Sequence, residues 1–137
     1  MLSRQRLIIE AVVCLLLARL ALRLFSFRRL TWFFSRPVRQ PQVTGAERQR
    51  IRKEVANAVR NTAGRLPGET ACFPRGIAAQ ALLRRRGIAT TLYYGAATLP
   101  DRGLTAHVWV MDGPAGVVGH AAAHRYRVLA YYPEPAQ

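Results

Sequence analysis

The sequence predicts an α+β fold in which helices come first along the chain and a small antiparallel sheet follows. Before Gly87, apolar residues recur at helical spacing over long stretches. After Gly87, short runs rich in Val, Thr, Leu and Tyr alternate with turns that contain Gly and Pro. The chain has 137 residues, half of them apolar, so it is long enough for one domain with a sizeable core.

We expect the chain to divide into an apolar helical arm with its connector, residues 1–43, and a domain, residues 44–137. The most apolar part of the arm is residues 7–27, which Glu10, Arg19 and Arg23 interrupt. A bilayer-spanning helix needs roughly 20 predominantly apolar residues, and a secretory signal would not carry Glu10 in its apolar region. The arm therefore predicts a long helix whose surface is covered by the domain, by a partner protein or by a membrane surface.

The segments that follow the arm predict a connector and a second helix. Residues 26–36 are rich in Phe, Trp and Arg, and residues 37–43 hold two prolines and two glutamines, as connectors do. Thr44 and Glu47 then fit a capping box that starts a helix. This helix would pack its apolar face on the core; the face is formed by Ile51, Val55, Val59 and Leu66.

A third helix is predicted to begin near Cys72 and to end at Gly87, a natural residue for a helix C-terminus. Pro74 is tolerated in the first turn, where backbone N–H groups have no intrahelical partner. A cysteine at a helix N-terminus feels the positive end of the helix dipole, which favours the nucleophilic thiolate. The alternative for Cys72 is a small buried apolar residue without chemistry.

The second half of the chain predicts three or four antiparallel strands. They are expected at residues 88–97, at residues 104–111, in a strand that begins with residues 117–120, and at residues 126–132. Alternation along the second strand puts His107 and Trp109 on one face and Val108 and Val110 on the other. His107 alone would suggest only a partly buried histidine of a sheet.

Cys72 and His107 together predict cysteine-dependent acyl transfer. A thiol attacks a carbonyl only after a base has taken its proton, and the same base later protonates the leaving amine. A helix end and a rigid strand would fix the two groups. The backbone N–H of the cysteine would also stabilise an oxyanion, and one such donor contributes roughly 10²–10³ in rate.

Charge and cysteine usage limit the other classes of function. The formal net charge is +14, from 21 Lys and Arg against 7 Asp and Glu, and Lys53 is the only lysine. The arginines are scattered and form no nucleic-acid motif, so we expect no nucleic-acid partner. Cys14 and Cys72 suggest no disulfide framework, which favours a reducing, cytoplasmic location. Without CxxC or HExxH, neither a metal nor a cofactor is expected.

Several motifs resemble one known family. They are Cys72-Phe73-Pro74-Arg75-Gly76, the run from Leu82 to Ile88, Tyr94-Gly95, Ala106-His107-Val108-Trp109-Val110 and Val117-Val118-Gly119. This pattern resembles the leader peptidase of lasso peptide biosynthesis, in the split form where a separate small protein recognises the leader. The resemblance extends over most of the chain, including the arm.

The resemblance implies a transglutaminase-like, papain-related core and removal of a leader peptide from a ribosomally made precursor. The implied partners are the precursor peptide, the small leader-recognition protein and an asparagine-synthetase-like cyclase. A membrane surface that meets residues 7–27 is a further candidate partner. Cys72 matches the nucleophile of the family and His107 its general base, and Trp109 is a candidate substrate-binding residue.

The third catalytic residue departs from the family pattern. The usual acid would lie where Gly119 and His120 stand, and neither is acidic. His120, a backbone carbonyl or a water molecule could orient His107 instead. Asp112 ranks lower, because strand alternation turns it to the other face. A non-catalytic scaffold or peptide-binding protein of the same pathway is the alternative function.

Overall fold

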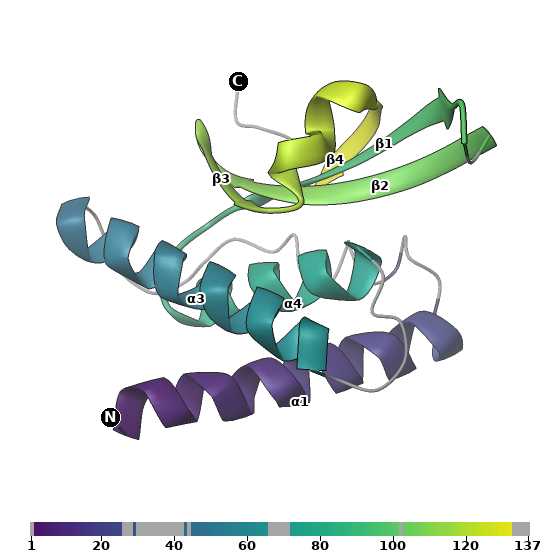
Figure 1. Ribbon diagram of the computed structural model, residues 1–137. Coiled ribbons are helices and arrows are strands. Elements are labelled where there is room, and N and C mark those ends of the chain that lie inside the picture. The colour runs from purple at the N-terminus through teal and green to yellow at the C-terminus, as the bar shows by residue number, and fades with distance from the viewer. Residues whose placement is uncertain are drawn as a thin grey trace.

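The sheet forms one layer and the helices lie on one side of it, with the N-terminal helix farthest from the sheet (Figure 1). The computed structural model describes residues 2–25, 29, 43, 45–65, 72–101 and 103–132, apart from the side chains of residues 2–4, 22, 72 and 73. In chain order the described elements are α1 (Leu2–Leu24), α3 (Gly45–Arg65), α4 (Cys72–Arg85), β1 (Thr91–Leu99), β2 (Gly103–Asp112), β3 (Ala115–Val118), the 3₁₀-helix η1 (His120–Arg125) and β4 (Arg127–Tyr132). This order confirms the predicted α+β class.

The four strands form one antiparallel sheet with the order β3-β2-β1-β4. β3 and β4 therefore lie at opposite edges, and the chain between them crosses the sheet as η1. Figure 1 shows η1 on one face of the sheet and the α-helices on the other. The two faces consequently have different neighbours, which matters for the site.

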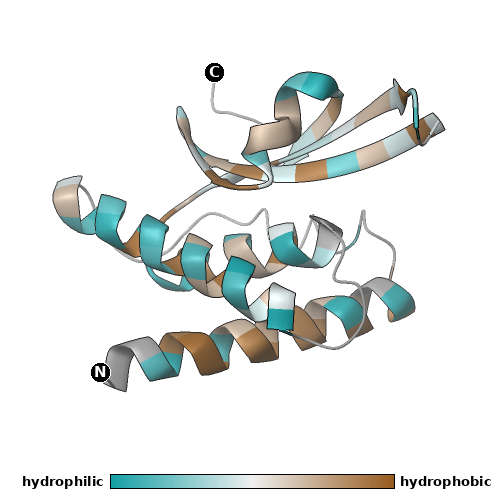
Figure 2. Cartoon of the chain, in the orientation of Figure 1, coloured by the Kyte–Doolittle hydropathy of each residue, from teal (hydrophilic) through white to brown (hydrophobic). Residues whose placement is uncertain are grey.

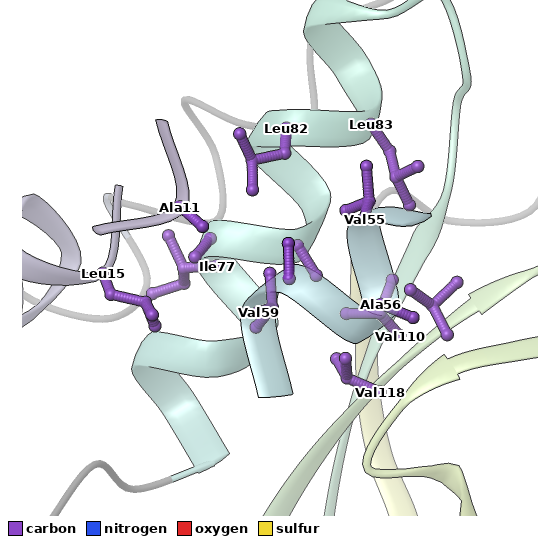
Figure 3. Packing of buried hydrophobic residues seen from close by; sticks show 14 of the residues in the cluster. Ala11, Leu15, Val55, Ala56, Val59, Ile77, Leu82, Leu83, Val110 and Val118 are labelled. Carbon is purple, nitrogen blue, oxygen red and sulfur yellow. The ribbon is translucent and has the colours of Figure 1, made fainter. Parts of the chain in front are cut away.

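The core lies between the sheet and the helices. Its fully buried aliphatic side chains come from each of the described α-helices and from the sheet, and include Leu92 and Val108. Figure 3 labels others of this cluster: Leu15, Val55, Val59, Leu82, Leu83 and Val110. α1 contributes Leu7, Ala11, Leu15 and Ala18 to the same cluster. One face of the N-terminal helix is thus packed on the domain.

α4 is the central helix, and its ends follow the rules that its sequence predicts. Its C-terminus is a Schellman-type cap in which Gly87 has a φ of 81°. The Gly87 N–H donates to the Arg84 carbonyl at 3.1 Å, and the Ile88 N–H donates to the Leu83 carbonyl at 3.0 Å. Gly76 lets α4 approach the sheet, since a Cβ there would lie only 2.7 Å from Val108 Cγ1.

One strand expectation is wrong at its end. The third strand was expected to include His120, but β3 ends at Val118 and His120 begins η1. The reason is Gly119, whose φ of 74° turns the backbone out of the extended conformation.

Two expectations lie outside the described residues. Thr44, the cap of the predicted capping box, is not among the residues that the structure describes, although α3 begins at Gly45 as the box implies. The same holds for most of the aromatic segment 26–36 and of the connector 37–43.

Candidate functional site

Cys72 is the first residue of α4, the position that the sequence predicts. Its side chain lies outside the described part of the structure. Pro74 is buried in the first turn, and Ile77 and Ala78 of the next turn belong to the core. A cysteine that opens a packed helix has the N-terminal location that favours thiolate.

His107 lies in the middle of β2 and is held on several sides. Its ring stacks on Tyr126, with centroids 4.8 Å apart, and on Trp109, with centroids 5.8 Å apart. Its Nε2 atom is 2.8 Å from the carbonyl oxygen of Gly119. A carbonyl oxygen only accepts hydrogen bonds, so the contact assigns the proton to Nε2 and leaves Nδ1 of the neutral ring as the basic nitrogen. This is the tautomer that a general base acting through Nδ1 requires.

Gly119 provides this carbonyl because it lacks a side chain. A Cβ at Gly119 would lie 2.7 Å from the Val108 carbonyl oxygen and 3.3 Å from His107 Nε2. Gly119 also has a positive φ, a backbone conformation that residues with a side chain rarely adopt. The Gly119 carbonyl is thus a backbone group of the kind considered from the sequence, and it contacts His107 in the described structure.

The other two candidates for the third residue have other neighbours. The ring of His120 lies against Gly116, where a Cβ would come within 2.1–2.5 Å of it. Asp112 is buried on the helix side of the sheet. Its Oδ2 accepts hydrogen bonds from Arg48 Nε and Arg52 Nη1, each at 3.1 Å.

The charge state of Asp112 reflects these arginines. Burial by itself raises the pKa of the Asp112 carboxyl, but hydrogen bonds and charge from Arg48 and Arg52 outweigh it, and the net pKa is lowered. Arg48 also donates to the carbonyl oxygens of Val43 and Ala89. Asp112 therefore anchors the start of α3 to the end of β2.

Trp109, the predicted substrate-binding residue, is 5% exposed. Its ring stacks almost parallel on Tyr93, with centroids 5.7 Å apart. Its edge covers Gly95, where a Cβ would approach the indole to 2.9 Å. Trp109 thus acts as a packing platform beside His107 and presents little free surface.

The faces of β2 separate the two predicted catalytic residues. Val108 faces α4, as its approach to Gly76 requires, and Val110 lies on the same side. His107 and Trp109 alternate to the opposite face, where Tyr126 and η1 lie (Figure 1). Cys72 and His107 therefore belong to elements that pack together, but the His107 ring points away from the α4 side.

Sequence reasoning did not single out the stacking of Tyr126 on His107 or the pairing of Asp112 with Arg48 and Arg52. Tyr126 is 19 positions from His107 and reaches it only because η1 crosses the sheet.

Within the described part of the chain, no group of three or more His, Cys, Asp or Glu side chains is placed to hold a metal ion.

Comparison with known families gives the class of the protein. Residues 13–131 match the family Transglut_core3, described as the transglutaminase-like superfamily. The match begins inside α1 and extends almost to the end of β4. The chain belongs to the transglutaminase-like superfamily. No curated protein and no solved structure gives a significant match.

Proposed function

We propose that the protein is a cysteine endopeptidase that removes the leader peptide from a lasso peptide precursor. Cys72 attacks the carbonyl carbon at the junction of leader and core, and His107 takes the thiol proton. The C–N bond breaks as His107 protonates the leaving amine, and water then hydrolyses the thioester. Membership of the transglutaminase-like superfamily supports the reaction class. The substrate is suggested by the sequence motifs around Cys72 and His107.

The observation that carries the proposal is the hydrogen bond between His107 Nε2 and the Gly119 carbonyl oxygen. In a cysteine peptidase the third residue mainly orients the base and fixes its tautomer. A neutral carbonyl does both, although it stabilises an imidazolium less than a carboxylate would. We therefore expect a working but weakened triad of Cys72, His107 and the Gly119 backbone.

The orientation of His107 sets a condition for activity. Its Nδ1 must come within hydrogen-bond reach of the Cys72 sulfur, yet its ring lies on the face of the sheet turned away from α4. Catalytic contacts often tighten only when substrate is bound. We infer that the precursor, presented by the leader-recognition protein, brings the start of α4 and His107 together before the cyclase acts.

Reconstitution tests this function. The protein is mixed with the precursor and the leader-recognition protein, and free core peptide is followed by mass spectrometry. Cys72→Ala should abolish cleavage, and His107→Ala should slow it by about 10²–10⁴-fold. Cys14→Ala, the matched control, should cleave at the wild-type rate. Undiminished cleavage by Cys72→Ala would refute the proposal.

A non-catalytic scaffold is the second candidate, and the direction of the His107 ring favours it. The rate of Cys72 alkylation at neutral pH separates the two candidates, best in the Cys14→Ala background. Burial raises the pKa of the Cys14 thiol, so Cys14 should be alkylated slowly. Its removal takes away this background and leaves Cys72 as the thiol that is measured. A Cys72 thiol that reacts no faster than an unperturbed thiol favours the scaffold.

A further inference from the structure

The outward side of α1 is an apolar surface that nothing in the described structure covers. We call outer face the side chains Ile9, Val13, Leu16, Leu17, Leu20 and Leu24. Each is between 48% and 67% exposed. The opposite side of the same helix is buried in the core through Leu7, Ala11, Leu15 and Ala18. A helix that is apolar all round normally has both sides covered.

The position of α1 makes the outer face accessible to a large, flat partner. α1 is the layer farthest from the sheet in Figure 1, and Figure 2 shows hydrophobic colour along much of it. From Ile9 to Leu24 the helix extends about 22 Å, at 1.5 Å per residue. None of the described helices is long and apolar enough to cross a membrane, so α1 would lie along a surface.

The charges around the outer face have one sign. Glu10, the only acidic residue of α1, is turned inward, where it pairs with Arg85 at 3.1 Å and with Arg86. Arg6 and Arg23 are exposed, and they lie one turn before Ile9 and one turn after Leu20. The outer face is therefore bordered by cations without a carboxylate from its own helix, on a chain of net charge +14.

We propose that the outer face of α1 binds the surface of an anionic lipid bilayer. The leucines, isoleucine and valine would enter the boundary between head groups and acyl chains, and Arg6 and Arg23 would reach the lipid phosphates. A second copy of the chain fits less well, because two outer faces would bring arginines together without acids from α1 to pair with them.

Vesicle co-sedimentation tests the proposal with the full chain. The probe is a vesicle of equal parts phosphatidylglycerol and phosphatidylcholine at low salt, compared with pure phosphatidylcholine. We expect binding to the anionic vesicles that weakens as salt is raised. The double variant Leu16→Gln/Leu20→Gln leaves the charge unchanged and should weaken binding by about tenfold or more, because it removes apolar surface from the contact.

Leu104→Gln is the matched control. Leu104 is 83% exposed at the start of β2, away from α1, so this variant should bind vesicles like the wild type. Arg6→Gln/Arg23→Gln should reduce binding to anionic vesicles and leave binding to neutral vesicles unchanged.

Three results would overturn the proposal. The first is a wild-type protein that does not bind anionic vesicles at low salt. The second is equal binding by the wild type and the Leu16→Gln/Leu20→Gln variant. The third is a concentration-dependent dimer, or a stable complex with the leader-recognition protein, that this variant abolishes while vesicle binding persists. Cleavage of the precursor in solution is measured separately, so failure here leaves the peptidase proposal unaffected.

Discussion

The two faces of the sheet differ in chemistry as well as in neighbours. The helix side carries Val108, Val110 and Leu92, which are buried against α3 and α4, and it ends in the buried Asp112. The other side carries His107 among the rings of Trp109, Tyr93 and Tyr126. The helix side builds the core, whereas the aromatic side holds His107, the proposed general base. Substitutions on the helix side should therefore lower mainly the stability of the fold, and substitutions on the aromatic side should lower mainly the proposed activity.

The substitution expected to lower the free energy of unfolding most lies on the helix side of the sheet, at Asp112. Asp112→Asn leaves Arg48 and Arg52 without their carboxylate partner, and breaking a buried pair typically costs about 3–5 kcal/mol. Both arginines are partly exposed, with side chains 25% and 18% accessible, so we expect a value near the lower end. Urea denaturation at pH 7 measures the loss. Glu54→Gln, which breaks an exposed pair with Arg50, should cost less than about 1 kcal/mol.

At acid pH, the free energies of unfolding of the wild type and of Asp112→Asn should differ less than at pH 7. The pKa of Asp112 is lowered in the folded state, so its contribution is fully present above the unfolded pKa of about 3.9 and is lost as pH falls through the folded pKa. Denaturation at pH 3 should accordingly give a smaller difference than at pH 7. A difference that does not change with pH would mean that the ion pairs do not stabilise the fold.

A smaller loss of stability is expected from Gly76→Ala, at the contact between α4 and β2. The Cβ of Gly76→Ala would lie 2.7 Å from Val108 Cγ1, a buried and stiff side chain that cannot move away easily. Overpacking of this kind typically costs about 1–3 kcal/mol. Gly64→Ala in α3 is the matched control, because nothing lies within 4 Å of its added Cβ. That variant should be neutral or slightly stabilising, and equal destabilisation of both would argue against close packing of α4 on β2.

A specific effect on activity is expected at Gly119 on the histidine side. Gly119→Ala would push against His107 Nε2 and the Val108 carbonyl. We expect core-peptide release to fall by about tenfold, which corresponds to about 1.4 kcal/mol of barrier. Nitrogen NMR of the His107 ring should report a changed tautomer population.

Gly113→Ala separates this effect from backbone strain. Gly113 also has a positive φ, 57°, but an added Cβ there meets nothing within 4 Å. Both variants carry the strain of a positive φ, and only Gly119→Ala adds a close contact with the Val108 carbonyl. Gly119→Ala should therefore lose more stability than Gly113→Ala, and only Gly119→Ala should slow cleavage. Equal activity of the two variants would exclude a positioning role for the Gly119 carbonyl.

Local sequence patterns predicted much of the fold. The start of a helix at Cys72, its end at Gly87 and the division of β2 into a valine face and a His107–Trp109 face all follow from spacing and backbone preferences. These features depend on residues close together in the chain. The same patterns failed at His120, because the positive φ of Gly119 ends the strand before it.

The sequence by itself therefore determined the order of the elements, the position of Cys72 at a helix N-terminus and the face of β2 that carries His107. Only the tertiary structure decided what surrounds them. A backbone carbonyl leaves no mark in the residue type, so the partner of His107 became visible only once Gly119 lay beside it. Asp112 and Arg48 are 64 positions apart, and no local pattern joins them. Tertiary packing likewise decided which side of α1 enters the core and which remains open to a partner.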